Sequence, residues 1–221
     1  MKKLVIFDLD GTLLNTIDDL GEATNHALRS LGYPTHALSV YPGYVGNGVR
    51  RLMERALPDS EATPEIVGAM LERFKEYYDE HGCDRTVPYP GIRELLLRLS
   101  DADVNLAVAS NKYQKAVEAI VPHFFPEVHW AALEGQKQGV PEKPDPSIVF
   151  EILTKCPTAK ADVLYVGDSG VDIETARRAC VDNVGVTWGY RPARELREAY
   201  ADRIVDTPAE IFDIVQSGSP L

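Results

Sequence analysis

Cysteine is scarce in this sequence, and the cysteines that are present are poorly spaced for pairing. Cys83, Cys156 and Cys180 are odd in number, lie far apart and never occur as C-x-x-C. Disulfide frameworks and structural zinc sites need several closely spaced cysteines. We therefore expect neither of them, and a reducing compartment fits best.

Long apolar runs and an excess of basic charge are also missing. The first apolar run, Leu4 to Phe7, has four residues, too few for the core of a signal peptide or for a membrane-spanning helix. The 221 residues include 23 basic and 34 acidic side chains, a net charge of −11, which argues against nucleic acid or an anionic membrane as the main partner. We expect a soluble, cytoplasmic protein, in which an anionic substrate would need local help from a metal.

What the chain does contain is a series of short apolar runs separated by helical patterns. The runs are continuously apolar, which is typical of strands buried on both faces of a sheet. They lie at 4–7, 104–109, 163–166, 184–186 and 203–205, and helical stripes lie at 92–99, 116–121 and 148–152. Strands that alternate with helices predict an α/β fold with a doubly wound, Rossmann-like parallel sheet.

Residues 16–85 differ from the rest, because they carry helical stripes and no strand pattern. One stripe runs from Ile17 to Leu31 and another from Ile66 to Tyr77. The prolines and glycine at 87–91 favour a turn where this segment ends. We predict a core of residues 1–15 and 86–221, an inserted helical domain of residues 16–85, and hinges at 14–16 and 87–91.

Polar residues follow three of the predicted strands at the point where each strand ends. They are Asp8 and Asp10 after the first strand, Ser110 and Asn111 after the second, and Asp168 and Ser169 after the third. The ligand crevice of an open parallel sheet lies outside the carboxyl ends of its strands, so we expect these residues to converge. Their carboxylates, with Asp172 close by, suit a hard divalent cation, above all Mg²⁺.

These residue types together predict a phosphoryl-transfer site. A carboxylate beside Mg²⁺, such as Asp8, can attack phosphorus because the metal neutralises the repulsion between two anions. Asp10 can protonate the leaving oxygen, while Lys143 supplies positive charge and Ser110 donates to the phosphate. Each residue alone has a simpler interpretation: a turn former for the first two aspartates, a helix N-cap for Asp168, a solvated charge for Lys143. Their order at successive strand ends favours the site.

The order of these motifs resembles that of haloacid dehalogenase superfamily phosphatases, in the branch whose cap is a helical insert after the first motif. The resemblance covers nearly the whole chain. It implies that Asp8 is a nucleophile that forms an aspartyl-phosphate and that Asp10 is the general acid/base. It also implies further roles: Ser110 and Lys143 at the phosphate, Asp8, Asp168 and the backbone carbonyl of Asp10 as Mg²⁺ ligands, and Asp172 and Ser169 around the metal's water shell.

Shorter strings are similar to those of phosphoglycolate phosphatases, among them the segments 45–50 and 110–112. The candidates for substrate binding are Gly11, Thr12, Ser110, Asn111, Asn47 and Arg50. Arg50 can meet a substrate carboxylate in a forked geometry, and its alternative is a solvated arginine. We interpret Trp188 and Tyr190 as packing residues and Arg191 as a surface charge.

We therefore predict a Mg²⁺-dependent phosphomonoester hydrolase that acts on a small phosphorylated metabolite as a monomer or homodimer. Phosphoglycolate is the favoured substrate. Relatives in the same superfamily leave open a sugar-phosphate or pyrophosphate phosphatase and a β-phosphoglucomutase-like enzyme. A receiver-type phosphoacceptor module uses similar ingredients, but it is a shorter chain and has no need of a helical insert.

Overall fold

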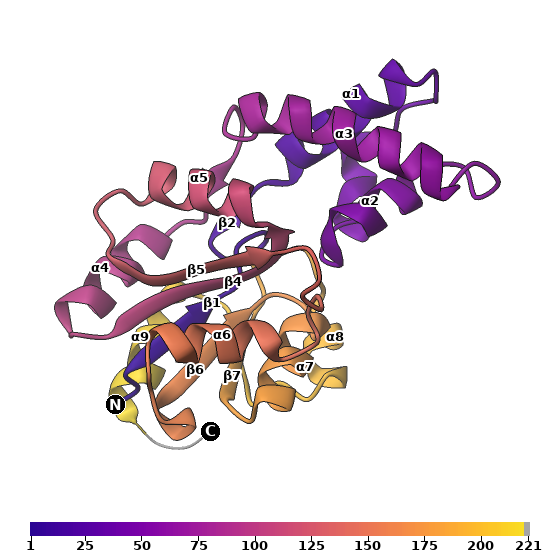
Figure 1. The fold of residues 1–221 in the computed structure, drawn as a ribbon. Coiled ribbons are helices and arrows are strands. Elements are labelled where there is room, and N and C mark those ends of the chain that lie inside the picture. Colours follow the sequence, from indigo (N-terminus) through magenta and orange to yellow (C-terminus); the bar gives the residue numbers. More distant parts are fainter. Residues whose placement is uncertain (219–221) are drawn as a thin grey trace.

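The computed structural model of this protein describes residues 1–218 and has a six-stranded parallel sheet at its centre (Figure 1). The strand order is β5-β4-β1-β6-β7-β8, and every pair of neighbours is parallel. The strands are β1 (Leu4–Phe7), β4 (Asn105–Tyr113), β5 (Trp130–Gln136), β6 (Val163–Gly167), β7 (Asp182–Val186) and β8 (Arg203–Val205). The predicted doubly wound α/β fold is confirmed.

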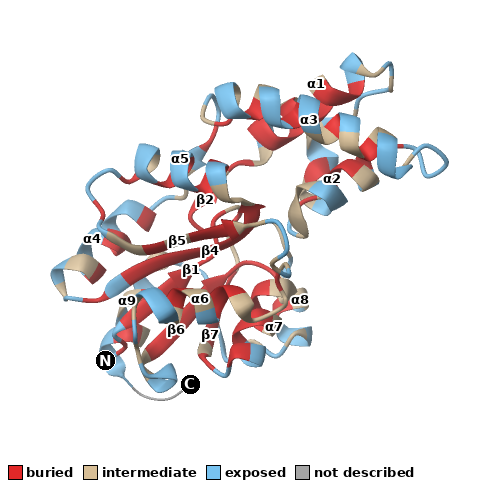
Figure 2. Ribbon diagram, in the orientation of Figure 1, coloured by how far each residue is buried: buried red, intermediate tan, exposed pale blue. Residues whose placement is uncertain are grey.

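Helices cover both faces of the sheet, which is why β1 is apolar without alternation. Val5 and Phe7 pack in one core cluster, whereas Leu4 and Ile6 pack in the other. The first cluster includes residues of α4 (Ile92–Asp101), α5 (Gln114–Phe124) and α9 (Pro208–Ser217), and the second includes residues of α6 (Ser147–Lys155) and α7 (Gly170–Ala179). Two short helices, η2 (Lys160–Asp162) and α8 (Ala193–Glu198), complete this part of the chain. Figure 2 shows the buried strands between helices whose outer faces are exposed.

A helical insert lies between β1 and α4, and its helices run from Ile17 to His81. Its helices are α1 (Ile17–Ser30), η1 (Leu38–Gly43), α2 (Gly48–Ala56) and α3 (Pro64–His81). They lie beyond one end of the sheet (Figure 1), and α2 contacts β4. The outgoing and returning segments pair as a small antiparallel ladder, β2 (Leu14–Asn15) with β3 (Val87–Pro88).

Local sequence explains why α3 begins where it does. Thr63 is its N-cap, and its side-chain oxygen accepts a hydrogen bond from the backbone N–H of Ile66 at 3.4 Å. Pro64 follows at the first helical position, where the missing N–H costs nothing. The apolar stripe of α3 then buries Met70 and Phe74 against the other helices of the insert.

The structure differs from the expected pattern mainly around β4 and β5. β4 continues to Tyr113, beyond the predicted end at residue 109, because it pairs with β5 as far as Tyr113, which lies opposite Gln136. β5 was not expected, since Glu134 and Gly135 interrupt its apolar run. No helix within residues 1–218 is long and apolar enough to span a bilayer.

Candidate active site

A buried lysine organises the carboxyl edge of the sheet. Lys143 lies between β5 and α6, and 2% of its side chain is exposed. Its ammonium donates to Asp8 Oδ1 at 2.8 Å, to Asp172 Oδ1 at 2.7 Å and to the carbonyl oxygen of Ala109 at 2.9 Å. The ammonium is thus held between two carboxylates from different elements, and this fixes Asp8 at the end of β1.

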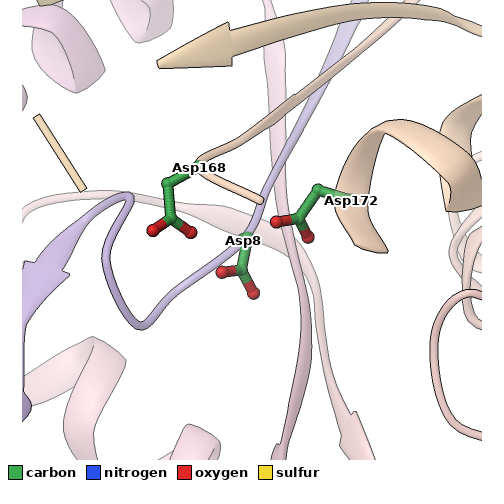
Figure 3. A group of neighbouring side chains, drawn as sticks. All are labelled: Asp8, Asp168 and Asp172. Carbon is green, nitrogen blue, oxygen red and sulfur yellow. The ribbon is translucent and has the colours of Figure 1, made fainter. Parts of the chain in front are cut away.

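Three aspartates, Asp8, Asp168 and Asp172, form an acidic cluster at this edge (Figure 3). One carboxylate oxygen of each lies within 4.8 Å of the other two. The pKa of Asp8 is raised to about 7, first by burial and then by the Asp172 carboxylate, while Lys143 opposes the rise. Burial and the carboxylates of Asp172 and Asp8 also raise the pKa of Asp168 well above its ordinary value. One lysine does not balance three buried carboxylates, so the cluster suits a divalent cation with oxygen ligands.

The start of α7 orients two members of the cluster. Ser169, not Asp168, is the N-cap of α7, and Asp172 completes its capping box. Asp172 Oδ2 therefore accepts from the Ser169 hydroxyl at 2.6 Å, while its other oxygen faces Lys143. Asp168 Oδ2 accepts from the backbone N–H of Tyr190 at 2.7 Å. Gly11 has φ +93°, and a Cβ there would lie 2.4 Å from Asp168 Oδ2, so the loop after β1 needs a glycine.

Asp10 lies apart from this cluster and has partners of its own. Lys112 donates to its two carboxylate oxygens at 2.9 and 3.0 Å, and the Thr16 hydroxyl donates to Oδ1 at 2.7 Å. The Lys112 side chain is 3% exposed, and its ammonium lies 4.8 Å from the centroid of the Tyr78 ring. Lys112 was not among the predicted site residues, although it follows Ser110 by only two residues.

Ser110 and Asn111 lie on the extended part of β4 and line the same cavity as the aspartates. Asn111 is a positioning residue here: its side-chain oxygen accepts from the Lys143 backbone N–H at 2.9 Å. Its amide donates to the carbonyl oxygens of Lys143 and Gly46, each at 3.2 Å. Asn111 thereby joins the lysine segment of the core to the loop that begins α2.

The cavity has a polar floor and an apolar ceiling. The floor is made by Asp8, Asp10, Ser110, Lys112, Lys143 and Asp168 with their neighbours. The helical insert contributes Leu20, Val45, Gly46, Gly48, Val49, Leu52, Phe74 and Tyr78. Among the described residues, therefore, the insert adds no charged side chain to the cavity wall. Tyr78 is buried in that wall, and its hydroxyl has no hydrogen-bond partner within residues 1–218.

Four of the candidates for substrate binding lie outside the cavity wall. Arg50 is exposed on α2, and the Asn47 side-chain oxygen accepts from Arg55 at 2.8 Å. Gly11 and Thr12 lie in the buried turn after β1, where Gly11 passes close to Asp168 and the Thr12 carbonyl accepts from the Trp188 indole N–H at 3.0 Å. The structure does not bring these four residues to the cavity wall. In the 43–48 loop, the backbone carbonyls of Val45 and Gly46 face the core, where they accept from Arg191 and Asn111.

Arg191 was interpreted from the sequence as a surface charge, but the structure shows that it is bonded to the helical insert. Its guanidinium donates to the carbonyl oxygens of Pro42 and Val45, both at 2.6 Å. It therefore ties the segment after β7 to the loop before α2, across the cavity that it also lines. The hydroxyl of Tyr190 accepts from the Thr16 backbone N–H at 2.8 Å and adds a second link to the start of the insert.

A parallel sheet with an acidic cluster at its carboxyl edge is typical of α/β enzymes that bind their ligands at that edge. The chain belongs to the haloacid dehalogenase-like hydrolases, whose family model matches residues 5–186. It is 34% identical to the phosphoglycolate phosphatase of Vibrio cholerae, over 96% of each chain. The predicted family is confirmed.

Solved structures agree with this assignment. A crystal structure from Lactobacillus delbrueckii subsp. bulgaricus, provisionally named a phosphoglycolate phosphatase, is 32% identical, with a TM-score of 0.90 over 97% of this chain and 99% of that one. A predicted phosphoglycolate phosphatase from Haemophilus somnus is also 32% identical, with a TM-score of 0.87 over 97% and 98% of the two chains. The chain is similar to these proteins over nearly its whole length.

Proposed function

We propose that this protein is a Mg²⁺-dependent phosphomonoester hydrolase that forms an aspartyl-phosphate on Asp8, and that 2-phosphoglycolate is its preferred substrate. One observation carries the proposal. A carboxylate at the end of the first strand lies within an acidic cluster, while a second carboxylate, Asp10, faces the same cavity with separate partners. Such a pair divides the work of nucleophile and proton donor between two environments.

The residues present fit Mg²⁺, because carboxylate oxygens gather where a single ammonium cannot neutralise them. Asp8 and Asp168 would hold the ion, together with the backbone carbonyl of Asp10. Asp172 would act mainly through Lys143, to which it is bonded at 2.7 Å. Bound Mg²⁺ would neutralise the phosphate oxygens and orient the phosphorus toward Asp8.

The protein groups then have distinct tasks. Asp8 forms a bond to phosphorus as the bond from phosphorus to the leaving oxygen breaks, and Asp10 gives its proton to that oxygen. Water, activated by Asp10, then cleaves the phosphate from Asp8 and restores the carboxylate. Lys143 holds Asp8 in place throughout, and the Ser110 hydroxyl donates to the phosphate oxygens.

The helical insert acts in this proposal as a cap that closes over the substrate and excludes bulk water. The cap is residues 16–85, and the core is residues 1–15 and 86–221. The segments at 14–16 and 87–91 serve as hinges, and their short ladder makes them move together.

The names of the relatives favour 2-phosphoglycolate over pyrophosphate or sugar phosphates. We propose to measure phosphate release from 2-phosphoglycolate, pyrophosphate, glucose 6-phosphate and β-glucose 1-phosphate, with Mg²⁺ and with EDTA. The highest kcat/KM is expected for 2-phosphoglycolate, and EDTA should abolish release. A preference for another compound would refute the substrate, and full activity in EDTA would refute the metal site.

Asp8→Asn tests the nucleophile separately. The variant should lose turnover while its melting temperature shows an intact fold, because an amide is a poor nucleophile toward phosphorus. Near-normal turnover would remove Asp8 from that role. Stoichiometric phosphate retained by the wild-type protein, without release, would instead favour a phosphoacceptor module.

A further inference from the structure

We propose that Lys112 is the specificity-determining residue for the leaving group, and that its ammonium binds the substrate's carboxylate in exchange for Asp10. The inference rests on the proposed function and deepens it. It replaces Arg50, which lies outside the cavity, as the group that recognises an anionic leaving group.

The charges around the cavity lead to this residue. The ceiling offers no cation among the described residues, so a carboxylate must be met from the core. Lys143 is held between two carboxylates and a carbonyl oxygen. Arg191 has both terminal nitrogens bonded to backbone carbonyls of the insert. Lys112 is bound by one carboxylate, that of Asp10, so it is the cation in the wall that an incoming anion can recruit most readily.

The position of Lys112 also suits this role. It follows Ser110 by two residues on β4, so its ammonium lies in the same cavity as the groups proposed to hold the phosphate. It also lies 4.8 Å from the centroid of the Tyr78 ring, at the boundary between the polar floor and the apolar ceiling. The Tyr78 hydroxyl is a buried donor without a partner in the described part of the chain.

The exchange has a consequence for Asp10. In this structure both oxygens of Asp10 are engaged by the Lys112 ammonium. A substrate carboxylate competes for the same ammonium, and its success releases Asp10 toward the leaving oxygen. A leaving group without negative charge cannot make this exchange. Lys112 therefore favours anionic leaving groups in two ways: its ammonium binds them, and their binding frees Asp10 to donate its proton.

Lys112→Met and Lys112→Gln remove the charge at nearly constant side-chain length, and the pair guards against a folding defect in one of them. The measurement is kcat/KM for 2-phosphoglycolate and for 2-hydroxyethyl phosphate, which carries an uncharged hydroxymethyl group in place of the carboxylate. Loss of a charge-assisted contact should lower the ratio of the two values about 10- to 100-fold, chiefly through KM for 2-phosphoglycolate. Lys115→Met is the matched control, since Lys115 is exposed on α5 and pairs with Asp79.

An equal fall for both substrates would overturn the proposal, because Lys112 would then act through Asp10 alone. So would a ratio that changes in Arg50→Met and not in the Lys112 variants. Calorimetric binding of 2-phosphoglycolate to Asp8→Asn, with and without Lys112→Met, gives a readout that needs no turnover. If the wild-type protein hydrolyses neither ester, the proposed function fails, and unchanged affinity in the double variant overturns the role of Lys112 independently.

Discussion

Asp19 ties the first turn of α1 to the segment that returns the chain from the helical insert to the core. Its carboxylate accepts from the backbone N–H of Arg85 at 3.0 and 3.1 Å and from the backbone N–H of Thr86 at 2.8 Å. It also accepts from the Thr86 hydroxyl at 2.7 Å. Asp19 and Thr86 are both buried, so water cannot replace these bonds without a rearrangement.

We expect Asp19→Ala to lower the free energy of unfolding by about 3 kcal/mol. A hydrogen bond to a charged group contributes about 1.5–3 kcal/mol, and an abandoned buried donor costs about 1–3 kcal/mol. The bonds share one carboxylate, so their energies do not add in full, and the Thr86 hydroxyl keeps an alternative acceptor in the Gly82 carbonyl at 3.0 Å. For a chain of 221 residues, this loss corresponds to a fall in Tm of about 6–12 °C.

Thermal unfolding followed by circular dichroism tests this expectation against a neighbouring control. Asp18 is acidic, lies in the same first turn of α1 and is exposed. Asp18→Ala therefore removes the same charge from the helix start without breaking the buried bonds, and should change stability by less than about 0.5–1 kcal/mol. If the two variants melt within about 2 °C of each other, the reasoning from buried hydrogen bonds is refuted.

Two further predictions follow from other buried contacts. Burial raises the pKa of Glu134, but hydrogen bonds from Lys137 and Lys155 outweigh it and lower that pKa below 4.5. A lowered folded-state pKa stabilises the protein above pH 4.5 and loses its effect as the pH falls through the folded value. Glu134→Gln should therefore reduce Tm at pH 7 and approach the wild-type value on acidification; a pH-independent difference in Tm would contradict this. Arg191→Lys cannot bridge two carbonyl oxygens of the insert as the guanidinium does. It should lower kcat/KM for the best substrate about tenfold, measured by phosphate release, and an unchanged value would show that the bridge has no role in the closed site.

Much of the fold was predictable because it depends on local patterns. Continuous apolar runs predicted β1 and β6 with nearly correct ends, since strands buried on both faces are mostly apolar throughout. Helical stripes predicted the helices of the insert, because such a stripe depends only on residues three or four positions apart in the chain. β5 was not predicted, because Glu134 interrupts its apolar run. This buried carboxylate forms ion pairs with Lys155 of α6 and with Lys137 of the loop after β5, and such distant pairings cannot be read from the local sequence.

The sequence predicted which residues come together in the candidate site, but not how their charges pair. Asp8 and Asp168 follow strands, and Ser110 lies in the last part of β4. The rule that parallel strands present their carboxyl ends at one edge brings the three residues together. Lys143 was found through its place in the motif order, and its ammonium lies 2.8 Å from Asp8. The rule concerns backbone topology, so it does not say which charges pair.

The sequence by itself thus determined five of the six strands of the sheet, the helical character of the insert and most of the residues at the carboxyl edge, because hydrophobic periodicity and strand ends are local properties of the chain. Only the tertiary structure decided the partners: Lys112 with Asp10, which are 102 residues apart, and Arg191 with the carbonyl of Val45, which are 146 apart. It also decided that Arg50 faces solvent. Such pairings depend on side-chain direction and on how the insert rests against the core, and neither is encoded in the periodicity of any single segment.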